Sequence, residues 1–194
     1  MFKKEKTIKN LLEKISYFFV LTCLANIIWI FLWHYEQILL SLIVMILLFF
    51  SLLIIYLRLN IGIEKVSMKE KLLVHVPISV YIGWITVATI TNVTALLVTS
   101  GWNGFGISEP LWTILILVIV TIISILMLLK RKDIAYSLVV IWALIGIALK
   151  RFGSDSIYGI QTDVAITSII AIIIILIMIL YISFKEKIIK IKKS

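Results

Sequence analysis

A chain of 194 residues of which 62% are hydrophobic and only 15% are charged carries far more apolar surface than one water-soluble core could bury. Its mean hydropathy of +1.18 excludes a soluble globular domain and favours a protein that dissolves in lipid. The net charge of +9 does not require nucleic acid as a partner, because the basic residues lie in short segments between apolar runs, as membrane topology demands.

Six apolar runs are long enough to cross the roughly 30 Å hydrocarbon core of a bilayer, given a rise of about 1.5 Å per helical residue. Lipid does not tolerate unpaired backbone groups, and none of the runs alternates polar with apolar residues, so each predicts an α-helix. The expected fold class is an all-α, polytopic integral membrane helical bundle, with residues 1–194 forming a single transmembrane domain. The last span is rich in isoleucine and almost featureless, so we expect it to lie peripherally. The predicted spans are residues 16–33, 37–57, 73–97, 111–129, 134–149 and 164–184.

Lysines and arginines alternate between the two sides of these spans. Five precede the first span, four lie in residues 58–71, three lie in residues 130–132 and five follow residue 184. The first and third connections carry none, and the fifth carries two. Because positive residues accumulate in cytoplasmic connections, this pattern predicts that both termini lie in the cytoplasm. We therefore expect a multi-pass protein of the cell (plasma) membrane, with the lipid bilayer and not nucleic acid as its partner.

The connections show helix-start signals and no catalytic motif. Ser108 with Pro110, then Asp133, and then Thr162 with Asp163 stand where the fourth, fifth and sixth helices are expected to begin. Residues 101–106 are glycine-rich but follow no strand and contain no lysine, so they predict a turn. Aromatic residues near the external boundary are typical of an interfacial belt, and they are Trp33, Tyr35, Trp102, Phe105, Trp112 and Tyr158.

Two groups of polar and aromatic residues lie deeper in the membrane than this belt. The first span carries Asn26-x-x-Trp29, and the third carries Tyr81-x-x-Trp84-x-x-x-Ala88-x-x-x-Asn92. Steps of four residues advance only about 40° around a helix, so the residues of the second group follow one stripe. An amide is costly in hydrocarbon without a partner, so we expect both groups to face other helices or a ligand. The Asn26 amide in particular should find a hydrogen-bond partner.

Simple helix packing is an alternative to a ligand pocket for each of these residues. His34 and His75 fall near opposite membrane faces and are interpreted as interfacial residues rather than haem ligands. Cys23 is a lone cysteine with no disulfide or metal partner in the sequence. No nucleophile and base can be paired, so we expect that the protein is not an enzyme and holds no metal.

Residues 23–92 resemble the tryptophan-rich sensory protein family (TspO/MBR, the translocator or peripheral benzodiazepine receptor proteins). One helix of that family carries an L-N-x-x-W motif, which appears here as Ala25-Asn26-Ile27-Ile28-Trp29. Another carries P-Y-L-x-W-x-x-x-A-x-x-x-N, whose spacing is kept here between Tyr81 and Asn92, although the proline is displaced to Pro77. A more specific likeness is to a bacterial branch of the family, in which residues 81–98, 101–112 and 131–146 resemble recurring blocks, and that likeness covers most of the chain.

The resemblance implies a protein that binds a flat hydrophobic ligand, tetrapyrrole- or sterol-like, between membrane helices. Family members also have an N-terminal span and a P-x-W-V-F-G-P-V-W-T-type segment that forms much of the pocket, and this chain begins after that point. Helices four to six have no counterpart in the five-helix members. We therefore expect either a truncated chain or a partner that completes the bundle. The ligand-binding residues that the resemblance implies are Asn26, Trp29, Tyr81, Trp84, Ala88 and Asn92.

Three functions stay open at this point. The first is a membrane-embedded sensor or regulator that binds a hydrophobic ring compound, with porphyrin or haem as a candidate ligand and no other cofactor. The second is a small membrane transporter, although no Asp, Glu, Lys or Arg lies inside any span to serve as an embedded ionisable group. The third is a ligand-free helix-packing or scaffold protein. A homo-oligomer is compatible with all three.

Overall fold

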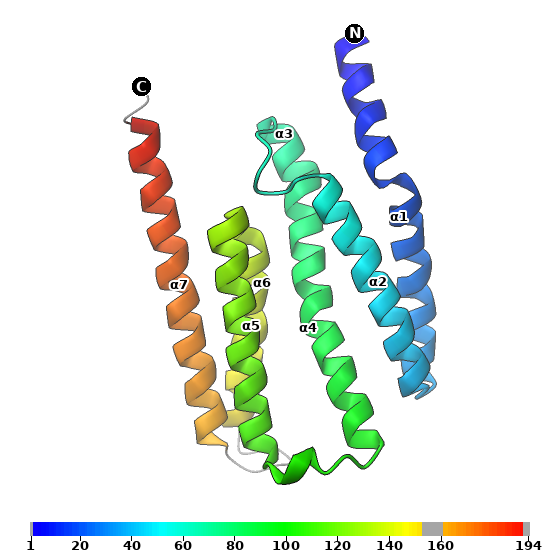
Figure 1. Cartoon of the computed structure of the whole chain (residues 1–194), viewed down its shortest axis with the longest axis vertical. Coiled ribbons are helices and arrows are strands. Elements are labelled where there is room, and N and C mark those ends of the chain that lie inside the picture. Colours follow the sequence, from blue (N-terminus) through cyan, green and yellow to red (C-terminus); the bar gives the residue numbers. More distant parts are fainter. Residues whose placement is uncertain (1, 153–160, 192–194) are drawn as a thin grey trace. The chain divides into compact units, whose positions relative to one another are not determined.

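The computed structural model describes residues 2–152 and 161–191, and every regular element within these residues is a helix (Figure 1). Six helical segments are long and apolar enough to cross a membrane, which confirms the all-α, polytopic membrane fold. The third begins at Met68 rather than at residue 73, because the Ser67 side chain caps it by accepting the N–H of Glu70 at 3.2 Å. The segments are Tyr17–His34, Ile38–Arg58, Met68–Thr99, Glu109–Arg131, Ile134–Phe152 and Thr162–Glu186.

The chain divides into two compact units, Met1–Trp102 and Asn103–Ser194, and each is described here by itself. A single domain over residues 1–194 therefore stays a prediction. Many large apolar side chains of both units are exposed. In a polytopic protein such side chains contact the acyl chains of the bilayer, since lipid is as apolar as leucine.

In the first unit α1 (Phe2–His34) packs on α2 (Ile38–Arg58), and α2 packs on α4 (Val76–Thr99) (Figure 1). The short α3 (Met68–Glu70) and the π-helical turn η1 (Lys71–His75) lead directly into α4. Steps of four and three residues separate the buried side chains of α2, which is the spacing of interlocking membrane helices. The residues on this spacing are Ser41, Met45, Leu48, Leu52 and Ile55, and their neighbours Ser51 and Tyr56 are buried beside them.

A tight turn joins α1 to α2 and fixes the position of one acidic residue. Glu36 has a left-handed backbone with φ of 55°. Its N–H donates to the carbonyl of Trp33 at 3.2 Å, and the N–H of Gln37 donates to the carbonyl of Leu32 at 2.8 Å. These bonds satisfy carbonyl groups that the end of α1 would otherwise leave without partners.

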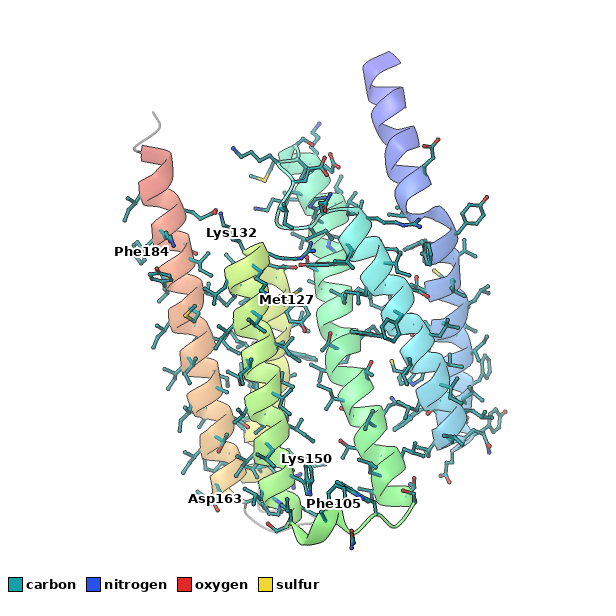
Figure 2. All side chains as sticks on the ribbon, in the orientation of Figure 1. Phe105, Met127, Lys132, Lys150, Asp163 and Phe184 are labelled. Carbon is teal, nitrogen blue, oxygen red and sulfur yellow. The ribbon has the colours of Figure 1, made fainter. Side chains whose placement is uncertain are left out.

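In the second unit α5 (Glu109–Arg131), α6 (Ile134–Phe152) and α7 (Thr162–Ile191) pack against one another, preceded by the 3-10 turn η2 (Gly104–Gly106). Buried serines on the three helices keep the side chains small where the backbones approach, and they are Ser124, Ser137 and Ser168. Lys132, in the turn between α5 and α6, forms an ion pair with Glu186 of α7 (Figure 2). Helix α7, which the sequence predicted to lie peripherally, packs against both α5 and α6.

Three predicted helix starts lie at or beside observed ones. Asp133 precedes α6, and its Oδ1 accepts the N–H of Tyr136 at 3.1 Å, as an N-cap does. Ser108 precedes α5 without a side-chain cap bond, and Thr162 is the first residue of α7. Among the expected interfacial aromatics, Tyr158 lies outside the described residues.

Candidate functional site

The stripe predicted on α4 does not face one neighbour along its whole length. Asn92 is 2% exposed, whereas Trp84 is 46% exposed, and Tyr81 and Ala88 are half-buried. Each step of four residues rotates the stripe by about 40°, so Trp84 and Asn92 point about 80° apart. The side chains that α4 buries follow steps of four and three instead, as in Ile78, Ile82 and Ile85. Asn92 lies on this buried face and Trp84 lies beside it.

Asn92 makes the polar contact between α2 and α4. Its Oδ1 accepts the hydroxyl of Ser41 at 3.0 Å, and its Nδ2 donates to the carbonyl of Ala88 at 3.3 Å. Both residues are buried, so neither polar group is left to face hydrocarbon unpaired. The expectation that this amide points toward another helix therefore holds for Asn92.

The first-span motif contributes a tryptophan with an unsatisfied polar group. The ring of Trp29 stacks on that of Trp33 with centroids 6.1 Å apart and an angle of 27° between the planes. The Trp29 Nε1 is buried and has no hydrogen-bond partner among the described residues. The half-buried Asn26 amide likewise makes no hydrogen bond to the part of the chain that the structure describes, so its expected protein partner is not found there.

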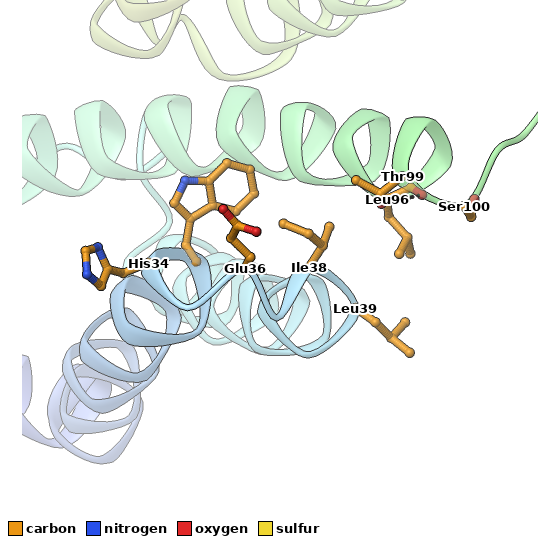
Figure 3. Close-up of a pocket in the computed structure, with 8 residues that line it drawn as sticks. His34, Glu36, Ile38, Leu39, Leu96, Thr99 and Ser100 are labelled. Atoms are coloured by element: carbon orange, nitrogen blue, oxygen red, sulfur yellow. Dashed lines mark hydrogen bonds between the residues drawn. The ribbon is translucent and has the colours of Figure 1, made fainter.

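An open cleft of about 740 Å³ lies at the end of the first unit where α1 ends, α2 begins and α4 ends (Figure 3). This is the end that the predicted topology places outside the cell. One wall comes from α1 and the following turn, and the opposite wall comes from α4. The lining residues are Trp33, His34, Glu36, Ile38, Leu39, Leu96, Thr99 and Ser100.

None of the six residues predicted to bind ligand lines this cleft, so their ligand role stays a prediction. Two of them, Trp29 and Asn92, lie one helical turn from residues that line the cleft. Trp29 stacks on the lining residue Trp33. Asn92 lies four residues before the lining residue Leu96, and Ser41 lies three residues after Ile38, so their hydrogen bond closes the helix interface one turn from the cleft.

Sequence reasoning missed the α4 wall and assigned Trp33 to the aromatic belt. A signal for the wall was present in the sequence. Continuing the alternating steps of four and three from Ile85 through Asn92 leads to Leu96 and then to Thr99, both of which line the cleft. The α1 wall carries no comparable signal, since a tryptophan at a helix end is usually interfacial.

The cleft combines apolar side chains with a few polar ones, as ligand sites generally do. The Thr99 hydroxyl donates to carbonyls of α4 at 2.9 and 3.1 Å, and the Ser100 hydroxyl donates to the Leu97 carbonyl at 3.0 Å. His34 makes an edge-to-face contact with Tyr35 at a centroid distance of 5.4 Å. His75, the other histidine, is buried in the π-helical turn at the opposite end of the unit. No group of three metal-ligating side chains occurs among the described residues.

Comparison with known proteins gives one match. The model of the TSPO-like protein family matches residues 1–181, and neither a curated protein nor a solved structure matches the chain. The match reaches into all six membrane-spanning segments, beyond the residues 23–92 on which the motif resemblance rests. It confirms that resemblance and places the chain in the general class of membrane sensor and binding proteins. The chain is therefore a multi-pass membrane protein that belongs to the TSPO-like family.

Proposed function

We propose that this protein is a sensor or regulator of the cell membrane that binds a flat hydrophobic ligand, such as a tetrapyrrole or a sterol, in the cleft of the first unit. It binds the compound without transforming it. The observation that carries the proposal is the cleft itself, because its volume of about 740 Å³ falls within the roughly 300–1,000 Å³ of small-molecule sites.

The tryptophan pair supports a flat ring compound as the ligand. Trp33 lines the cleft, and its ring stacks on the ring of Trp29. A second flat ring can stack on the exposed part of Trp33, and stacked aromatic pairs add about 0.5–1.5 kcal/mol beyond the area that they bury. Ile38, Leu39 and Leu96 supply the apolar surface for the rest of the compound.

The arrangement of the helices supports a sensing role. Both walls belong to helices that pack on α2, and the Asn92–Ser41 bond joins α2 to α4 one turn from the cleft. A ligand that favours one spacing of these walls shifts the helix packing toward that spacing. A transporter would use ionisable groups at mid-membrane, and no span of this sequence supplies Asp, Glu, Lys or Arg there.

Tryptophan fluorescence of the full chain in phosphatidylcholine nanodiscs tests the proposal, with octaethylporphyrin, which carries no carboxylate, and a fluorescent sterol as the probes. Saturable quenching is expected for at least one of them. Leu96→Phe fills the cleft and should weaken binding at least about tenfold, which is about 1.4 kcal/mol. Val98→Phe is the matched control, because Val98 is an exposed α4 residue outside the cleft. Equal quenching in both variants would place the ligand outside the cleft, and no saturable quenching in the parent would favour the ligand-free scaffold.

A further inference from the structure

The cleft lies where two helices end, and this sets the sign of its electrostatic potential. α1 ends at His34 and α4 ends at Thr99, and both residues line the cleft. The carboxyl end of a helix carries the equivalent of about half a negative charge and favours cations nearby. Two such ends meet at this site with the positive amino end of α2, whose first residue Ile38 also lines the cleft, so the helix ends together leave a net negative contribution.

Glu36 adds a full negative charge at the same place. Its side chain is exposed, lines the cleft, and forms no ion pair with any described residue. The left-handed turn that holds it is fixed by the hydrogen bonds on either side of it. The turn therefore fixes the backbone of Glu36 at the edge of the cleft, with its carboxylate within the lining (Figure 3).

No lysine or arginine close in sequence offsets this charge, and the one histidine of the cleft, His34, lies two positions before Glu36. Residues 15–57 and 72–129 contain no lysine and no arginine, and these stretches include every residue that lines the cleft. In the first unit the basic residues with described side chains, such as Arg58 and Lys71, lie at the opposite ends of α2 and α4 from the cleft. The lysines and arginines of the first unit with described side chains therefore do not neutralise Glu36.

Trp33, the aromatic residue in the wall of the cleft, also favours a cationic ligand. Trp33 is 38% exposed and lines the cleft. A tryptophan face attracts ammonium groups through its quadrupole, and it does so most strongly where water is partly excluded. Ile38, Leu39 and Leu96 meanwhile provide a surface for an apolar body.

We infer that the cleft selects cationic amphiphiles, that is, compounds with a flat apolar body and an ammonium group that lies against Glu36 and Trp33. This inference rests on the proposed function and names the ligand class of the same site. It predicts that a carboxylate-bearing ring compound binds more weakly than an ammonium-bearing compound of the same size, because the two helix ends and Glu36 repel it.

Three probes with one ring body test this class. The full chain in nanodiscs of zwitterionic phosphatidylcholine is titrated with pyrenemethylammonium, pyrenemethanol and pyrenecarboxylate, and energy transfer from tryptophan to pyrene is measured against empty nanodiscs. We expect the ammonium probe to bind about tenfold more tightly than the carboxylate probe, with the alcohol between them. The preference should shrink as salt rises, since the site is open to solvent.

The variant Glu36→Gln assigns the preference to its source. It should remove most of the ammonium preference and leave the affinity for the alcohol unchanged. Glu109→Gln is the control, because it removes one acidic charge from the first turn of α5, outside the cleft. If Glu36→Gln retains the full ammonium preference, or if the three probes bind equally well to the parent, the inference is wrong while the proposed function stands. If no probe gives saturable transfer, the proposed function itself fails.

Discussion

The Oγ of Ser41 lies 3.0 Å from the Oδ1 of Asn92 on the neighbouring helix and 2.8 Å from the carbonyl oxygen of Ile38 in its own helix. A serine hydroxyl has one proton, so Ser41 donates to one of these two oxygens at a time. The Asn92 amide is held from its own side by the bond to Ala88. The hydrogen bond between α2 and α4 therefore competes with one inside α2 for the same proton, within one turn of the cleft.

A double-mutant cycle measures this contact. Ser41→Ala leaves the Oδ1 of a buried amide without its partner, and Asn92→Ala removes the amide altogether. Interhelical hydrogen bonds in membranes average about 0.6 kcal/mol and reach about 1.7 kcal/mol. We expect a coupling free energy in this range, measured by reversible unfolding in bicelles.

Ser51→Ala on the same helix is the control for that cycle. The Ser51 hydroxyl donates to the carbonyl of Leu47 in its own helix at 2.7 Å, and Ser51 is buried like Ser41. Its removal should show no coupling to Asn92→Ala. A coupling below the error of the measurement for Ser41 would mean that the hydroxyl donates to Ile38 alone.

The turn before α5 offers a comparison between two glycines. Gly104 and Gly106 both have positive φ, of 64° and 76°. A Cβ on Gly104 would lie 3.0 Å from the Nε1 of Trp112, whose N–H donates to the Gly104 carbonyl at 2.7 Å, whereas a Cβ on Gly106 meets nothing within 4 Å. Gly104→Ala should therefore destabilise the second unit more than Gly106→Ala does.

The expected difference is about 1 kcal/mol, the worth of one displaced hydrogen bond. Thermal unfolding of the full chain, followed by the accessibility of a cysteine placed at Phe105 in a Cys23→Ser background, measures it. Trp112→Phe, which removes the indole N–H, should bring the two alanine variants closer together. Equal destabilisation by the two substitutions in the parent would show that only the backbone strain matters.

The membrane fold could be predicted from the sequence because lipid permits few alternatives. A span of about twenty apolar residues without alternation has to be helical, and the six segments follow from that rule alone. The burial of Asn92 followed from the cost of an amide in hydrocarbon. Its partner did not, because Ser41 is a single small polar residue in an apolar run, and the register that brings it to Asn92 depends on how two helices pack.

The candidate site was harder to predict than the fold. A stripe built from steps of four residues rotates around α4, and for this reason it mixed the buried Asn92 with the exposed Trp84. The cleft depends on the ends of two helices that are distant in sequence, with Leu96 on one side and Trp33 on the other. Only the packing of α1 and α4 on α2 brings those ends together.

Ala88→Phe distinguishes the predicted stripe from the cleft. Ala88 is half-buried and lies two turns before Leu96, so a ligand held in the cleft should keep its Kd within about twofold in this variant. The larger side chain is expected to overpack the helix interface and to cost about 1–3 kcal/mol of stability. Quenching by octaethylporphyrin in nanodiscs gives the Kd, with Leu96→Phe measured in parallel and Ala88→Val as a milder variant. Loss of binding in the Ala88 variants alone would instead place the ligand along the stripe.

The orientation of the chain in the membrane is predicted by its basic residues, and the cleft's access depends on it. Single cysteines at Lys6 and at Asn103, in a Cys23→Ser background, should react with a membrane-impermeant maleimide from opposite sides. Asn103 should be labelled in intact cells and Lys6 only after permeabilisation, because the connection that contains Asn103 carries no lysine or arginine whereas five such residues precede the first span. A third cysteine at Glu36 should share the behaviour of Asn103. Two spans lie between these residues, and an even number of crossings returns the chain to the same side of the membrane. If the cysteines at Glu36 and Lys6 are labelled from the same side, the cleft faces the cytoplasm and the predicted topology is wrong.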